Sequence, residues 1–340
     1  MRPVSRNIAF LSLIIAAAAA FIANISLGPV QIPAWDVFSV FTGGDASKPS
    51  WTYIIQNYRI PKAIAALLAG AGLSISGLLM QTLFRNPLAG PYVLGLSSGS
   101  SLGVAFSIMG AGLLPSALSS VLTAPGGIIL ASCLGSLMVL LAVMAVSARM
   151  RETMSILIVG LMFGSFTAAI VGVLTYFAPA EDLQRFTFWS LGNLGNLAWE
   201  SVAILSLAVI VGLLLAIRCI KPLDSLLLGE RYAASIGMDI RLARWAIILS
   251  TSILAGSITA FVGPIAFIGL AVPHMARLLF GTASHRVLFP ATVLLGAIVL
   301  LFCDTMTQFP GTDILLPINA ITSLIGAPIV IWLLVKKPQT

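Results

Sequence analysis

The feature that most constrains the fold of this chain is a succession of long apolar segments separated by short polar intervals. Only 9% of the 340 residues are charged and 59% are hydrophobic, whereas a soluble domain carries about 25% charged residues. Because so few ionised groups cannot cover a water-facing surface, most of the surface must face lipid. At about 20 residues per span, the pattern predicts an all-α integral membrane protein with roughly ten transmembrane helices, in a single domain over residues 1–340.

The expected spans are 7–27, 60–83, 92–110, 127–148, 154–177, 200–217, 245–262, 265–280, 287–308 and 315–335. For the first, a cleaved signal peptide is the alternative, although its apolar run is longer than the roughly 7–15 residues of such peptides. Segment 265–280 is short and contains Pro273, which favours a tilted or re-entrant helix. We expect the interval 28–56 to be a polar loop.

Basic residues indicate the orientation. Of the 18 lysines and arginines, 14 fall on one predicted side, and the other four are Lys48, Arg59, Lys62 and Arg185. The positive-inside rule makes the richer side cytoplasmic. An even number of spans then places both termini in the cytoplasm, with the chain in the inner membrane. The net charge of +7 therefore reflects orientation in a lipid bilayer and not binding to nucleic acid.

Residues that support chemistry are scarce. The chain has two histidines, His274 and His285, and no HExxH, GxSxG or GxxxxGK[ST] motif, so it cannot hydrolyse ATP through a phosphate-binding loop. Its three cysteines lack CxxC spacing, which favours packing roles over a disulfide framework or a zinc site. We therefore expect no catalytic residue, no metal site and no cofactor, and a membrane-embedded enzyme has almost no support.

The source of energy for transport is the next question. An ion-driven carrier usually needs intramembrane carboxylates or histidines, and Asp304 is the clearest ionisable residue inside an expected span. This scarcity favours a partner that supplies the energy. A stand-alone ion-coupled secondary transporter remains the alternative.

The charged interval 218–244 is too polar to span a membrane. Gly229 and Gly237 divide it into two short helices that share an apolar face. Such a pair fits a groove of a soluble partner, or it rests on lipid headgroups. Two segments of the chain are weakly similar to each other, LLAGAGLSISG before Gly90 and ILAGSITAFVG before Gly263. This similarity indicates either an inverted-repeat transporter or chance similarity between Gly-rich helices.

Five segments carry a resemblance to a known family. They are YRIPK at 58–62, FRNPLAGPYVLGLSSGSSLG at 84–103, GPIAFIGLAVPHMARLLFG at 263–281, HRVLFPATVLLGA at 285–297 and LPINAITSLIGAPIVIWLL at 316–334. In this order they resemble the FecCD family, the permeases of bacterial metal-chelate ABC importers for cobalamin, haem and iron-siderophores. The resemblance implies the ten-helix type II importer fold in a homodimer. It also implies two ATP-binding subunits and a periplasmic or lipid-anchored substrate-binding protein.

The resemblance also implies roles for individual residues. It places ATPase-coupling helices at about 220–241, with coupling residues Leu226, Leu228, Gly229, Glu230, Ala233 and Gly237. It implies that Arg59 and Lys62 dock the binding protein, with interfacial snorkelling as the alternative. The gate maps to Thr153 and to Met154, where the family usually has a small polar residue. The implied pathway residues are Met80, Gln81, Leu83, Ser165 and Thr167.

The substrate class follows from the same resemblance. Gln308 stands where cobalamin permeases carry a basic residue. We therefore expect an iron-siderophore or haem, with cobalamin next.

Overall fold

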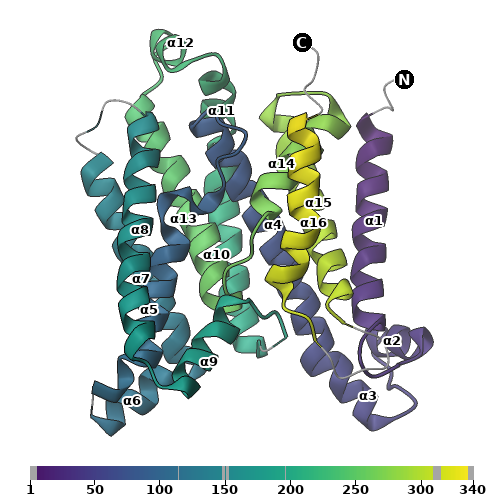
Figure 1. Cartoon of the computed structure of the whole chain (residues 1–340). Coiled ribbons are helices and arrows are strands. Elements are labelled where there is room, and N and C mark those ends of the chain that lie inside the picture. The colour runs from purple at the N-terminus through teal and green to yellow at the C-terminus, as the bar shows by residue number, and fades with distance from the viewer. Residues whose placement is uncertain are drawn as a thin grey trace.

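The computed structural model describes residues 6–113, 115–147, 150, 153–195, 197–308 and 315–335, and this part of the chain is helical without a β-strand (Figure 1). The helices are α1 Arg6–Ser26, α2 Ala34–Phe41, α3 Pro49–Ile54, α4 Ile60–Leu83, α5 Leu96–Met109, α6 Ser116–Thr123, α7 Pro125–Ser147, α8 Thr153–Phe177, α9 Ala180–Ser190, α10 Trp199–Arg218, α11 Ile220–Leu227, α12 Glu230–Ser235, α13 Ile240–Val262, α14 Ile268–Phe280, α15 His285–Met306 and α16 Ile318–Val335.

Seven helices in the described part of the chain are long and apolar enough to cross a membrane. They are α1, the α3–α4 rod, α7, α8, α10, α13 and α15. Three shorter apolar helices, α5, α14 and α16, coincide with the remaining expected spans. The all-helical membrane class is therefore confirmed, and the number of ten spans stays a prediction.

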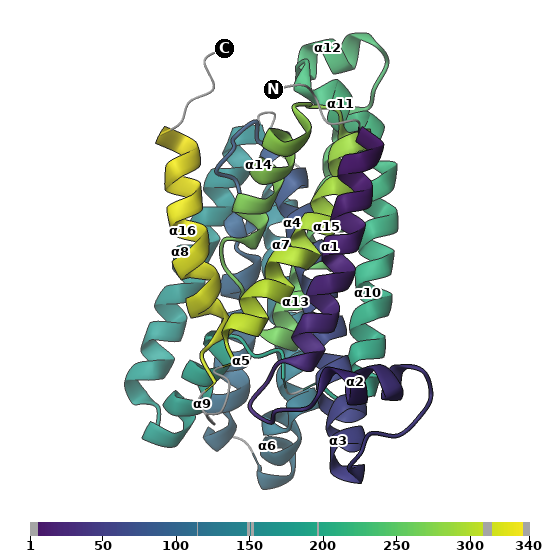
Figure 2. The same cartoon turned by 90° about the vertical axis from the view of Figure 1, so that its right-hand side faces the viewer.

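Helix α4 is the centre of the bundle, because it contacts α1, α10, α13, α14 and α15. Its glycines explain how closely these neighbours approach. A Cβ atom at Gly70 would collide with the Gly296 carbonyl of α15, and one at Gly77 would collide with the Gly269 carbonyl of α14. Small residues let helix backbones touch in this way in a membrane, where close packing drives association. Helix α1 lies on the outside of the bundle (Figure 2). Both α1 and α8 expose apolar side chains to the surroundings.

The interval 28–56 is not the loop that we expected. It holds helices α2 and α3, and α3 runs through a π-helical turn, Ile55–Arg59, straight into α4. The result is one continuous rod of 35 residues, Pro49–Leu83. Polar residues of the π turn resemble a loop in the sequence, and we therefore placed the start of this span too late. The charged interval is also shorter than expected, because α13 begins at Ile240, after an Asp239 side chain that accepts from the Leu242 amide.

The two interrupted segments of the chain meet each other. The turn of 3₁₀-helix Pro91–Leu94 precedes α5, and an irregular stretch precedes α14. The Tyr92 hydroxyl donates to the Ile265 carbonyl at 3.1 Å and accepts from the Ile265 amide at 3.3 Å. Gly95 and Phe267, which precede α5 and α14, both have left-handed backbones. A side chain of the first break therefore pairs both peptide groups of Ile265 in the second, although the inverted repeat itself stays a prediction.

The bundle has two distinct ends (Figure 1). One end carries α11 and α12, together with the start of α1 and the end of α16, and we call it the hairpin end. The other carries α2, α3, α6 and α9, and we call it the opposite end.

Candidate functional site

The hairpin end is built around α11 and α12, two short helices that place apolar side chains on two sides. Leu223, Leu226 and Ala233 are buried against the bundle. Leu228 and Tyr232 are exposed, and so is Ile236 after the end of α12. The two helices and their glycine boundaries are confirmed as the sequence predicted them. The exposed apolar side chains give this hairpin a surface that the described residues of the chain do not cover.

Gly229 joins the two helices in a conformation that other residues rarely adopt. Its backbone has φ 121° and ψ 147°, a region that is essentially restricted to glycine. A Cβ atom here would also lie 3.1 Å from the Arg85 guanidinium. Gly237 ends the hairpin with φ 85°, but in open space. The sharp turn at Gly229 therefore depends on glycine for both backbone geometry and space.

A cavity of about 670 Å³ lies between the hairpin, the end of α4 and the start of α8. It brings together residues that the sequence assigned to three different roles. Leu83 comes from the expected pathway, Met154 from the expected gate, and Leu228, Gly229 and Glu230 from the expected coupling segment. Of the gate pair, Thr153 begins α8, and its side chain lies outside the described part of the structure.

Glu230 is held at the edge of this cavity by a cation. Its Oε1 lies 3.4 Å from the Arg244 guanidinium, which belongs to the second turn of α13. The Glu230 side chain is 38% exposed and the Arg244 side chain 12%. This ion pair connects α12 to a long helix of the bundle.

The expected pathway residues do not form one surface. Met80 and Gln81 are buried in α4, and Gln81 accepts from Arg277 at 2.6 Å while it donates to the Leu270 carbonyl at 3.1 Å. On α8, Thr167 is buried and Ser165 is exposed. The structure thus joins Leu83 to the gate region and places Ser165 on a separate, outward face. The pathway assignment stays a prediction.

At the opposite end, both expected docking residues have partners inside the chain. The buried Arg59 donates to the carbonyls of Ile25 and Ser26 at the end of α1 and to that of Val30 in the connection that follows. These bonds cap the end of α1 and connect it to the α3–α4 rod. Sequence reasoning missed this function, because it saw only a cation near the membrane surface.

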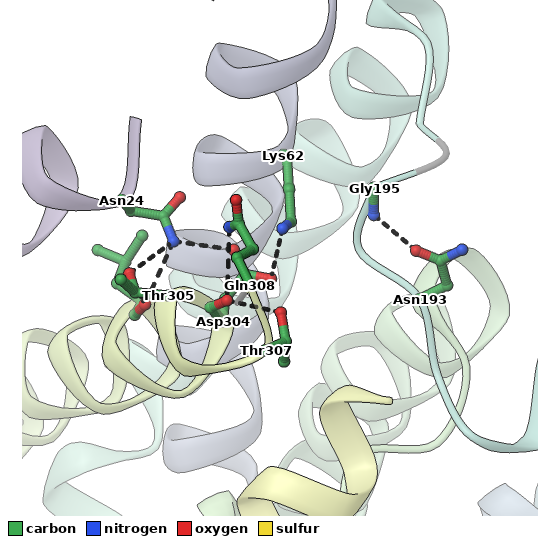
Figure 3. Close-up of polar contacts among 9 residues, drawn as sticks. Asn24, Lys62, Asn193, Gly195, Asp304, Thr305, Thr307 and Gln308 are labelled. Atoms are coloured by element: carbon green, nitrogen blue, oxygen red, sulfur yellow. Dashed lines mark hydrogen bonds and ion pairs between the residues drawn. The ribbon is translucent and has the colours of Figure 1, made fainter. Parts of the chain in front are cut away.

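Lys62 forms a buried ion pair with Asp304. The Nζ–Oδ1 distance is 3.1 Å, and the two side chains are 17% and 2% exposed. Asn24 of α1 donates to the other Asp304 oxygen at 2.8 Å, so that three helices meet at one carboxylate (Figure 3). The Gln308 amide oxygen accepts from Lys62 at 2.8 Å in the orientation that satisfies both groups. Docking by Arg59 and Lys62 stays a prediction.

Cys219 provides a chemical test of the junction between α10 and α11. It is buried, and burial raises the pKa of its thiol to about 11. Because the thiolate is the reactive form, a raised pKa keeps the thiol protonated and unreactive near neutral pH. In a variant that keeps only this cysteine, we expect maleimide to label the protein after SDS unfolding but not before, as measured by mass spectrometry. Rapid labelling of the folded protein at neutral pH would contradict this packing.

The architecture defines a class of protein. A bundle of long apolar helices whose outer members expose apolar side chains is a multi-pass membrane protein.

Comparison with known proteins identifies the family. The model of the FecCD transport family matches residues 13–336. The vitamin B12 import system permease protein BtuC of Vibrio parahaemolyticus is 36% identical over 289 residues, covering 84% of this chain and 83% of that protein. The hemin transport system permease protein HmuU of Yersinia pestis is 34% identical over 288 residues, covering 84% of each chain.

The fold comparison agrees. A solved structure of a transporter assigned to the metal-chelate ABC type, in an inward-facing conformation, superposes with a TM-score of 0.84 at 26% identity over 96% of this chain and 99% of that one. The chain belongs to the FecCD transport family of permeases of metal-chelate ABC transporters. It is a permease subunit and not itself an ATPase, so the family resemblance in its motifs is confirmed.

Proposed function

We propose that this chain is the permease of an ABC importer that moves an iron-siderophore or haem inward, with cobalamin as the next candidate. The observation that carries the proposal is the α11–α12 hairpin with its exposed apolar side chains beside the cavity at the start of α8, in a chain of the FecCD family. Relatives named for vitamin B12 and for hemin are almost equally similar, so identity does not rank these substrates. Gln308 favours an iron-siderophore or haem, because the resemblance places a basic residue of cobalamin permeases at this position.

The proposed assembly follows from the two ends of the bundle. Two ATP-binding subunits would contact the hairpins of a homodimer at the cytoplasmic side of the inner membrane, where both termini would lie. The three shorter apolar helices, α5, α14 and α16, would complete ten spans. A periplasmic or lipid-anchored binding protein would deliver the chelate to the opposite end. There a carboxylate of that protein would compete with Asp304 for Lys62.

The chain itself breaks and makes no covalent bond in this mechanism. ATP binding would draw the two ATPase subunits together, and the hairpins would transmit this movement to α4 and α8. Met154 would line the inner gate next to Leu83. The exposed Ser165 on α8 would face the pathway between two copies. Two permease copies would then alternate between outward and inward access.

Reconstitution in sealed proteoliposomes tests the proposal. The permease is combined with its ATPase subunit and binding protein, and uptake of radiolabelled haem, ferric siderophores or cyanocobalamin is measured. We expect uptake to require internal ATP and to persist when an uncoupler abolishes the ion gradient. Uptake without the ATPase subunit, or uptake that an uncoupler abolishes while ATP is present, would instead support a stand-alone secondary transporter.

The coupling assignment predicts the effect of two substitutions in the hairpin. Glu230→Gln removes the charge pair with Arg244, and Gly229→Ala imposes a side chain on a backbone that excludes one. We expect each to lower the chelate imported per ATP hydrolysed by roughly threefold to tenfold, while the permease stays folded. The matched control is Glu181→Gln, an exposed position on α9 at the opposite end. Full transport in both hairpin variants would refute the assignment.

A further inference from the structure

Helix α11 is fastened to the bundle through an aspartate–histidine–threonine contact. Asp224 of α11 accepts from both the backbone amide and the ring Nδ1 of His285, at 2.8 and 2.7 Å. The other ring nitrogen, Nε2, lies 2.9 Å from the hydroxyl of Thr82 near the end of α4. His285 is buried, and both of its ring nitrogens are engaged. One imidazole therefore joins α11, α15 and α4.

A second contact fastens α11 two residues further on, near its carboxyl end. Arg85, in the turn after α4, donates from Nε and Nη2 to the Leu226 carbonyl at 3.2 and 2.8 Å. A cation at the carboxyl end of a helix also complements the helix dipole. Arg85 has a left-handed backbone with φ 47°, which is uncommon for a residue other than glycine. The turn is thus shaped so that this guanidinium reaches α11.

Apolar packing beside these two contacts also holds α11 against the bundle. Leu223 and Leu226 are buried, and α11 packs against both α4 and α15. Helix α12 has fewer attachments, because it contacts α11 and α13 and exposes Tyr232. Leu228, in the turn before α12, is exposed as well. The hairpin therefore has one anchored helix and one outward-facing helix.

Helices α4 and α15 are also joined to each other along their length. The joining pairs, from the hairpin end to the opposite end, are Thr82 with His285, Gly70 with Gly296, and Lys62 with Asp304. A hydrogen bond, a backbone contact and an ion pair hold the helices at three levels. The α4–α15 pair therefore has the contacts of a rigid strut from one end of the bundle to the other.

We propose that Asp224–His285–Thr82 and Arg85–Leu226 form a two-point clamp that makes α11 move as one body with the α4–α15 strut. Thr82, Arg85, Asp224 and His285 are positioning residues for transport, since they act through the helices that they join. A displacement that a partner imposes on α12 then reaches Lys62 and Asp304 at the opposite end through this strut. The direction of this transmission rests on the proposed function, but the rigidity of the joint does not.

The rigidity is tested first, without any substrate or partner. Spin labels replace two exposed residues, Lys221 on α11 and Leu88 in the turn after Arg85, in a cysteine-free chain in lipid nanodiscs. Pulsed electron paramagnetic resonance then measures the distribution of distances between them. We expect one narrow distribution in the parent and a broad or shifted one in the double variant Arg85→Gln/His285→Asn. Unchanged distributions in the double variant would overturn the clamp.

Thr82 provides the matched pair for the same measurement. Thr82→Val keeps the shape but removes the hydroxyl, whereas Thr82→Ser keeps the hydroxyl. We expect Thr82→Val to broaden the distribution of distances and Thr82→Ser to leave it as in the parent. If the double variant does not fold, these two variants test the clamp. Arg241→Gln, at an exposed position of α13, serves as the charge control and should leave the distribution unchanged. Equal distributions for valine and serine would count against the clamp.

The transport readout is measured separately. In proteoliposomes with ATPase subunit and binding protein, Thr82→Val should raise the ATP hydrolysed per haem or cyanocobalamin imported roughly threefold or more, and Thr82→Ser should not. If the parent imports neither probe, haem and cobalamin are excluded as substrates, while the distance measurement still decides the clamp. If the distances change and this ratio does not, the clamp is not used in transport and the proposed positioning role is wrong.

Discussion

Replacing Asp304 with alanine should reduce the free energy of unfolding by about 3–5 kcal/mol, the usual cost of removing one partner of a buried ion pair. The substitution leaves the Lys62 ammonium without its carboxylate in a site where the ion-pair side chains are 17% and 2% exposed. It also removes an acceptor from Asn24. Thermal or denaturant unfolding of the purified protein in detergent measures the loss, and a loss below about 1 kcal/mol would show that the pair is solvated.

The double variant Lys62→Met/Asp304→Leu separates the ion pair from the packing. Both charges disappear together, so no unpaired charge is left in the bundle, and an apolar pair of similar volume is often tolerated. We expect this variant to be more stable than Asp304→Ala. Asp45→Asn, in an exposed part of the connection before α3, is the charge control and should change stability by less than about 0.5 kcal/mol. A double variant as unstable as the single one would indicate that shape, and not charge, matters here.

Replacing Gly77 with alanine should have an even larger effect, because the new methyl group has no place to go. Its Cβ would overlap the Gly269 carbonyl of α14, and backbone cannot move aside as a side-chain tip can. We expect a loss greater than the roughly 1–3 kcal/mol of ordinary overpacking, with little or no folded protein recovered. Fluorescence-detected size-exclusion chromatography and thermal unfolding measure this loss.

Two other glycines provide controls for Gly77. A Cβ at Gly72 would meet chiefly the flexible tip of Ile258, so Gly72→Ala should cost less than Gly77→Ala. Gly172 in α8 has no atom within 4 Å of the added Cβ, and Gly172→Ala should be neutral or stabilising by up to about 1 kcal/mol through helix propensity. If Gly77→Ala unfolded within about 2 °C of the parent, α4 and α14 would not be in backbone contact.

Most of the helices follow from the sequence, since apolar length is a local property. The predicted spans match α1, α7, α8, α10 and α15 within a few residues. The failure lies at Ile55–Arg59, where three exposed polar residues and the buried Arg59 continue a helix, and within the described residues only the Arg59 side chain has distant partners. Arg59 donates to three carbonyls more than twenty residues away in sequence. No local pattern reveals such partners.

In the candidate site, too, local features were predictable and contacts between distant residues were not. Gly229 and Gly237 marked the ends of two helices correctly, because a left-handed turn leaves a signature in one residue. The contacts that fasten those helices were not predictable. Asp224 and His285 are 61 residues apart, and Thr82 and His285 are 203 apart. In the sequence, Asp224 and His285 have no local pattern that connects them. Only the fold brings them into contact.

The meeting of Tyr92 with Ile265 has a consequence for how the two interrupted segments can move. Each break leaves peptide groups that its own helix cannot pair, and in a nonpolar interior an unpaired peptide group costs several kilocalories per mole. If only one break shifted, the amide and the carbonyl of Ile265 would lose the hydroxyl that pairs them. A displacement that carries Tyr92 and Ile265 together avoids this cost and is therefore the lower-energy one.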